Sequence, residues 1–178
     1  LTEPSAVRSA AAESLGSVNP TRAMPHLFEV LDEKNTMVTN TLARLLGQMG
    51  EIAQESLLAA LFEKGREDGA LIALAYMPLP PAKPILGFAR AEVSRAEEYD
   101  ALMRGVSSQR RNEAMSLLSD ALHKRSHEHG IRALRAVGLL GDRSAMNTAI
   151  ENLLAPDTSQ RANVIEALES IAARVSIR

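Results

Sequence analysis

Three histidines near the middle of the chain have the most ligand-like chemistry. They stand in the stretch HKRSHEH as His123, His127 and His129. His123 and His127 are four positions apart, so on a continuous helix they share one face, a spacing that can hold zinc. However, Lys124 and Arg125 surround them with positive charge, and no glutamate stands in an HExxH frame. We therefore expect a solvated helix end here, without a metal.

Basic residues are concentrated in one part of the chain. Residues 1–100 hold nine Lys or Arg against fourteen Asp or Glu, whereas residues 101–143 hold eight against four. Such a basic segment can meet an acidic partner domain, anionic lipid or nucleic acid, and the alternative is that its charges are scattered around several helices. The candidate interaction patch comprises Arg104, Arg110, Arg111, Lys124, Arg125, Arg132 and Arg135.

Composition limits the classes of function. The formal net charge is −2 and aromatic residues make up 3%, with no Trp and two Tyr, so a nucleic-acid binder would lack both basic excess and stacking groups. Cysteine is absent, which excludes disulfides, thiolate metal sites and cysteine nucleophiles. No set of residues resembles a catalytic or cofactor site. Asp157 and Arg161 fit structural roles, as a helix cap and an ion-pair partner, and Thr158 or Ser159 could equally be the cap.

A short hexamer recurs along the chain. Its small third residue is Gly16, Gly47, Ala75 or Gly138, at spacings of 31, 28 and 63 residues. A period of roughly 30 residues is typical of a solenoid, in which each unit buries its apolar face only against its neighbours. The hexamers are SLGSVN (14–19), LLGQMG (45–50), ALAYMP (73–78) and AVGLLG (136–141).

Each hexamer is interpreted as a joint between two helices. Asn19, Gly50 and Gly141 fall just past a helix end, where a left-handed turn is expected, and Pro78 stops a helix by another route. A glycine in the last helical turn indicates close approach of the partner helix. The predicted structural joints are Gly16, Asn19, Gly47, Gly50, Pro78, Gly138 and Gly141, together with Asp157 and Arg161.

Apolar residues recur at helical spacing on both sides of each joint. The pattern predicts an all-α fold, an α-α superhelix of about five helix pairs, with regular repeats at about 4–78 and 127–174. The middle, about 79–126, is irregular, because four prolines stand in MPLPPAKPI and two helical segments, 82–106 and 108–125, follow. We leave open whether it hides a degenerate repeat or one long helix. No apolar stretch is long enough to cross a bilayer.

Two resemblances follow from these motifs. EPSAVRSAAAESLGSVNPTRAMPHLFEVLDEKN, residues 3–35, resembles a HEAT-like repeat of the short class also seen in phycobilisome lyase-type proteins, through the Val7-Arg8 pair, the Leu-Gly joint, Pro25 and Leu27. Residues 129–171, beginning HGIRALRAVGLLGD, resemble the HEAT-repeat segment of bacterial membrane proteins that carry a nucleotide (ADP/ATP) carrier-like transporter domain and a cyclic-nucleotide-binding domain. The second resemblance implies a cytoplasmic module on the cytoplasmic face of a membrane protein.

These observations favour one function over two alternatives. We expect a non-catalytic scaffold, without a cofactor, that binds a protein partner or neighbouring domains of its own chain and meets a membrane only through a fused domain. The start at Leu1, without Met, suggests a piece of a larger protein. The alternatives are a phycobilisome-lyase-like enzyme or chromophore-handling protein, which predicts a deep pocket, and a HEAT-like nucleic-acid-binding protein, which predicts salt-sensitive DNA binding.

Overall fold

The chain is built from α-helices joined by turns. The computed structural model describes residues 5–31, 36–78, 80–107, 113–141 and 143–154, and no strand occurs within these ranges. The helices are α1 (Ser5–Val18), α2 (Pro20–Glu29), α3 (Thr36–Gln48), α4 (Glu51–Ala60), α5 (Glu67–Ala75), α6 (Ala82–Ser107), α7 (Glu113–Gly138) and α8 (Arg143–Leu154).

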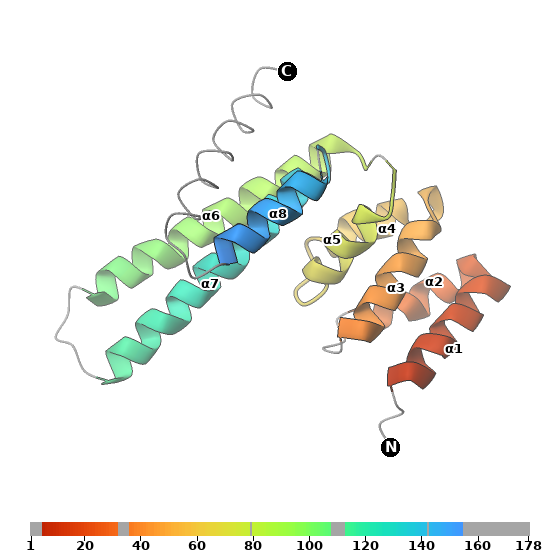
Figure 1. Cartoon of the computed structure of the whole chain (residues 1–178), viewed down its shortest axis with the longest axis horizontal. Helices are drawn as coiled ribbons and strands as arrows, with labels where there is room; N and C mark the ends of the chain where they lie inside the picture. The colour runs from red at the N-terminus through yellow and green to blue at the C-terminus, as the bar shows by residue number, and fades with distance from the viewer. Residues whose placement is uncertain (1–4, 32–35, 79, 108–112, 142, 155–178) are drawn as a thin grey trace.

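Four of these helices form a continuous row. α1 packs against α3, α3 against α5, and α5 against α7, while α2, α4 and α8 pack beside them as second helices (Figure 1). Each pair therefore buries its apolar stripe against the next pair, which is the principle of a helical solenoid. The predicted all-α superhelical fold class is confirmed.

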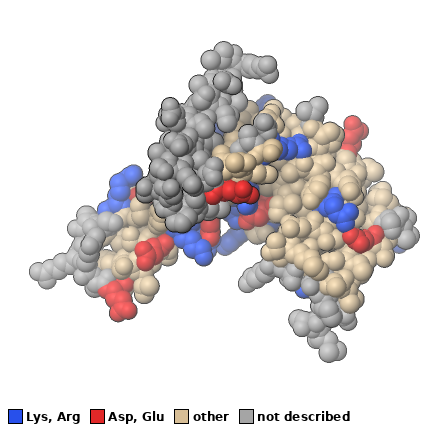
Figure 2. Space-filling model, viewed as in Figure 1, with Lys and Arg blue, Asp and Glu red and all other residues tan. Residues whose placement is uncertain are grey.

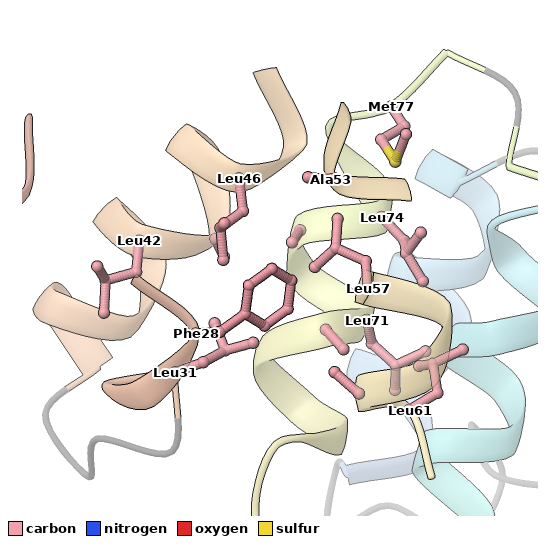
Figure 3. Packing of buried hydrophobic residues seen from close by; sticks show 14 of the residues in the cluster. Phe28, Leu31, Leu42, Leu46, Ala53, Leu57, Leu61, Leu71, Leu74 and Met77 are labelled. Carbon is pink, nitrogen blue, oxygen red and sulfur yellow. The ribbon is translucent and has the colours of Figure 1, made fainter. Parts of the chain in front are cut away.

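The apolar core runs along this row and is made largely of leucine and alanine. Ala43, Ala53 and Ala73 are completely buried, which lets the helices approach closely. Figure 3 shows side chains from successive helices meeting in one layer. Its labelled members are Phe28, Leu31, Leu42, Leu46, Ala53, Leu57, Leu61, Leu71, Leu74 and Met77. Val7, which the periodicity places on an apolar stripe, is 49% exposed instead.

The glycines of the hexamers differ in how closely neighbouring side chains and backbone approach them. A Cβ on Gly47 would stand 2.4 Å from the carbonyl oxygen of Ala73, and one on Gly138 would stand 2.7 Å from Cγ of Met146. Gly47 and Gly138 are therefore needed for close contact between α3 and α5 and between α7 and α8. Gly16 is different, because a Cβ there would meet Leu45 only at an ordinary 3.7 Å.

The turns after the hexamers also differ from one another. Gly50 has φ +60° and ψ −130°, a conformation that favours glycine. The left-handed turn predicted at Asn19 is wrong: its φ is −152°, and its Oδ1 caps α2 by accepting a hydrogen bond from the backbone N–H of Arg22 at 3.1 Å. The prediction is also wrong for Gly141, which has no positive φ. Pro78 lies just beyond α5, which ends at Ala75.

The irregular middle contains two long helices. α6 and α7 have 26 residues each, pack against one another along their length, and project from the row as a hairpin (Figure 1). Pro80 and Pro81 immediately precede α6, and Pro84 lies in its first turn, where the backbone N–H groups need no helical partner. The predicted segment 108–125 and the start of the repeats expected from about 127 are joined in α7, which runs from Glu113 to Gly138 without a break.

Candidate functional site

A pocket of about 680 Å³ opens where the hairpin leaves the row. Its walls come from three places: the turn between α4 and α5, the middle of α6 and the middle of α7. On the face shown in Figure 2, basic and acidic side chains lie close together at this junction. The pocket therefore combines segments that are far apart in the sequence, and its lining carries charges of both signs.

The wall formed by the hairpin contains a buried carboxylate. Glu92 of α6 is completely buried and contacts two side chains: Nη1 of Arg95 lies 2.5 Å from Oε1, and Nδ1 of His129 lies 2.8 Å from Oε2. The ring of Tyr99 stacks on that of His129 with centroids 5.4 Å apart. A buried carboxylate needs such partners because burial disfavours its charged form. This cluster fixes α6 against α7 beside the pocket.

A second ion pair joins α5 to α7. Arg132 binds Asp68 through two hydrogen bonds, Nε to Oδ1 at 3.0 Å and Nη2 to Oδ2 at 2.7 Å, and Nη1 of Arg135 lies 3.8 Å from Oδ1. Burial alone would raise the pKa of Asp68, but the hydrogen bonds and charge of Arg132, with the charges of Arg135 and His129, lower it below its usual value. In return, the bond to Asp68 raises the pKa of Arg132 against the effect of burial.

The turn between α4 and α5 has a fixed shape. Gly65 has φ +93°, and its backbone N–H donates to Oε2 of Glu67 at 2.7 Å. On the same turn, the ring of Phe62 meets that of Phe88 edge to face, with centroids 5.7 Å apart. Because Phe88 is fully buried in α6, this contact ties the turn to the hairpin. The pocket wall opposite Glu92 is thereby held in place.

The arrangement suits recognition of charge and shape. Two lining residues are paired with carboxylates that lie outside the lining, His129 with Glu92 and Arg132 with Asp68. At the rim, Lys64 and Arg125 are exposed, and so is Glu98. Exposed apolar side chains, Phe62 and Leu102, stand beside these charges. This pocket can therefore bind a ligand that presents both charge and an apolar group.

A smaller pocket of about 330 Å³ lies between α5, α7 and α8. Its lining is mainly apolar, with Ile72, Leu139 and Met146 among its members. Arg143 of α8 closes one end, because its guanidinium donates to the carbonyl oxygens of Ala75 and, at 2.7 Å, Met77. These bonds satisfy carbonyls at the end of α5 and anchor the start of α8.

The structure divides the candidate basic patch. Arg132 and Arg135 face Asp68, and Arg125 pairs with Glu128 at 3.1 Å on the exposed side of α7. Of the predicted patch residues, Arg125 and Arg132 line the larger pocket together. Arg104 stands in the last turn of α6, near the hairpin tip, and Lys124 is exposed in the middle of α7. Arg110 and Arg111 lie outside the described residues, as do Asp157 and Arg161.

The three histidines have separate environments. His123 and His127 are exposed, with ring centroids 6.5 Å apart, whereas His129 contacts Glu92 in the hairpin. The expected helix end is wrong, because all three stand inside α7. In the part of the chain that the structure describes, no three His, Asp or Glu side chains come together as a metal site.

Sequence reasoning missed the two acidic residues that pair with His129 and Arg132 of the pocket lining. For Glu92 a signal was available: Ile85, Phe88 and Glu92 share one face of a helix, so a carboxylate stands in an apolar stripe. A carboxylate at such a position indicates a buried partner. Asp68 carried no such signal, because its partner Arg132 stands 64 positions away in the chain.

Comparison with known proteins finds one family that is similar to the first part of the chain. Residues 2–77, which include α1 to α5, match the family model of HEAT repeats. No curated protein and no solved structure matches the chain significantly. Among the described helices, none is long and apolar enough to cross a membrane. Residues 2–77 are therefore similar to HEAT repeats, which generally act as scaffolds for protein interaction.

Proposed function

We propose that this chain is a non-catalytic scaffold module that holds a protein partner or a neighbouring domain of the same polypeptide. The observation that carries the proposal is the open angle between the α6–α7 hairpin and the row of α1, α3 and α5, with a mixed polar and apolar pocket at its base. An exposed concave surface of this kind is what a stacked helical protein offers to a partner.

Exposed apolar side chains support this proposal. Single exposed apolar residues are normal on any protein, but here large ones recur on successive elements. Ile52 stands on α4, Phe62 on the turn after it, and Leu102 and Leu117 on the two helices of the hairpin. Leu117 is 65% exposed, although it lies on one of the longest helices. Such residues supply the apolar contacts that a binding surface needs.

We further propose that the module belongs to a larger membrane-associated transporter-like or signalling protein and lies on its cytoplasmic side. The support is the resemblance of residues 129–171 to the HEAT segment of such proteins. In that setting the module would transmit displacements between a membrane domain and a nucleotide-binding domain. Reading the gene on both sides of this sequence tests the proposal: membrane-spanning segments and a β-rich nucleotide-binding domain are expected, and their absence contradicts it.

Site-specific photo-crosslinking tests the scaffold function directly. A benzophenone amino acid placed at Leu102, at Leu117 or at Ile52 in the parent protein should form a discrete adduct on irradiation in cells. Lys83, which is exposed at the start of α6 away from the pocket, serves as the control position. Mass spectrometry of the adduct identifies the partner or the domain. Failure of all three positions to crosslink above the Lys83 control contradicts a scaffold role for this surface.

A further inference from the structure

We propose that the pocket at the base of the hairpin binds a short acidic protein segment that inserts an apolar side chain. This inference deepens the scaffold function and rests on it. It specifies the place where the partner binds and the chemistry of the segment that binds. The charges at the rim, the apolar wall and the size of the pocket each support it.

Positive charge predominates at the rim. Lys64, Arg95 and Arg125 line the pocket with partly or largely exposed side chains, against Glu98 as the exposed acidic residue. Arg125 is 64% exposed, and its pair with Glu128 connects two surface positions one helical turn apart. Such a pair contributes little to stability and is readily exchanged for another carboxylate. Arg95 contacts Glu92 through Nη1, and a guanidinium has further N–H donors. Carboxylates of a partner therefore find donors on two sides of the pocket.

An apolar wall stands beside these charges. Phe62 is 53% exposed and Leu102 is 57% exposed, and both line the pocket. Phe62 is positioned by its edge-to-face contact with Phe88, and Tyr99 by its stacking on His129. The aromatic groups are thus already ordered before a ligand arrives, which lowers the entropic cost of binding. Preordered aromatic groups around a pocket are typical places for an anchoring side chain.

The size of the pocket and its acidic residues favour a peptide over a nucleic acid. A volume of about 680 Å³ accommodates a few residues and lies in the range of small-ligand pockets. Glu98 at the rim and Glu67 in the lining would repel a continuous phosphate backbone. A peptide can place its carboxylates at Lys64 and Arg125 and its apolar side chain between Phe62 and Leu102. The mixed lining therefore selects an acidic segment with an apolar anchor.

Selection of peptides by the full chain tests this assignment. A library of random peptides displayed on phage is selected against the 178-residue protein, and the enriched peptides are synthesised with a fluorescein label for anisotropy measurements. We expect enrichment of Asp and Glu around a large apolar residue. The double variant Lys64→Glu/Arg125→Glu should weaken binding about tenfold or more, because two attractive contacts become repulsive.

Matched control variants distinguish loss of contacts in the pocket from a general effect of net charge or hydrophobicity on binding. Arg22→Glu/Lys83→Glu makes the same change in net charge at exposed positions outside the pocket and should leave the Kd within about twofold. Leu102→Gln should weaken binding, whereas Leu117→Gln, at an even more exposed position outside the pocket, should not. All four proteins are checked for unchanged unfolding curves, and exposed positions were chosen so that each variant folds.

Three results would overturn the inference. One is a selection that returns no peptide or only peptides without acidic residues. Another is equal binding of the selected peptides to both charge-reversed proteins. The third is binding of single-stranded DNA or of anionic phosphatidylserine vesicles to the wild-type protein but not to Lys64→Glu/Arg125→Glu. This result would assign the rim to another class of ligand. In any of these cases, crosslinked adducts at Ile52 or Leu117 would still support the scaffold function.

Discussion

Asp68 and Arg132 form a two-point contact between α5 and α7, with N–O distances of 3.0 and 2.7 Å. This contact connects the row of short helices to the long hairpin, so its loss should loosen the junction. We expect Asp68→Asn to lower the free energy of unfolding by about 1 kcal/mol, a modest value because the Asp68 side chain is 48% exposed. Urea denaturation at neutral pH measures the change. Asp120→Asn, an exposed change on α7, should alter stability by less than about 0.5 kcal/mol.

The same pair predicts a pH dependence. The pKa of Asp68 is lower in the folded protein than in the unfolded chain, so its ionised form favours folding. The contribution is complete above the unfolded pKa of about 3.9 and is lost as the pH falls through the folded pKa. The stability difference between wild type and Asp68→Asn should therefore be constant from about pH 5 to 8 and shrink in more acidic solution. Growth of that difference on acidification would contradict the assigned direction.

The buried carboxylate of Glu92 provides a second test. His129→Ala removes one of its two polar partners and should destabilise the protein by about 3 kcal/mol, because a buried carboxylate loses a hydrogen-bond partner. The double variant Glu92→Met/His129→Ala removes the charge as well, so it should be less destabilised than the sum of its single variants. Thermal and urea unfolding of the full cycle measure this coupling. His127→Ala, on an exposed face of the same helix, is the matched control.

Replacing glycine by alanine at the third position of two different hexamers should change the free energy of unfolding in opposite directions. Gly47→Ala would force a Cβ to within 2.4 Å of a backbone oxygen and should cost about 1–3 kcal/mol. Gly16→Ala meets only ordinary contacts at 3.7 Å in helix α1 and should stabilise the protein by up to about 1 kcal/mol. Unfolding free energies measure both. Equal effects of the two substitutions would be inconsistent with the packing of α3 on α5.

The two turn glycines give a further contrast. A side chain at either Gly50 or Gly141 would meet open space, so any difference between them must come from the backbone. Gly50→Ala should destabilise the protein by about 1–3 kcal/mol, because φ +60° with ψ −130° is unfavourable for alanine. Gly141→Ala should be nearly neutral, since Gly141 has no positive φ. Comparison of the two unfolding midpoints tests this difference.

The repeated part of the fold could be predicted from the sequence because its signals are local. The spacing of Gly16, Gly47 and Ala75 indicated stacked helix pairs, and the apolar periodicity located most of the buried leucines. The same pattern failed at Val7, because periodicity alone does not show whether a neighbouring helix covers a given face. It also failed to distinguish the extended turn at Asn19 from the positive φ at Gly50, since both residue types tolerate several turn conformations.

Prediction of the hairpin and the pocket would have required contacts between residues that are far apart in the sequence. The boundary predicted near residue 126 suggested separate helices, yet α7 continues across it from Glu113 to Gly138. A count of basic residues likewise gave no indication that Arg132 and Arg135 face Asp68. Charge along a sequence predicts a surface only when the acidic partners from other elements are known.

Because the hairpin is long, a small rotation at its base produces a large displacement at its tip. A helix of 26 residues is about 39 Å long, so a rotation of only about 5° at the base would move the far end by roughly 3 Å. Such a rotation is opposed at the base by Arg132, through Asp68, and by Arg143, through the end of α5. The position of the hairpin tip therefore depends on a few polar contacts at the opposite end of the two long helices.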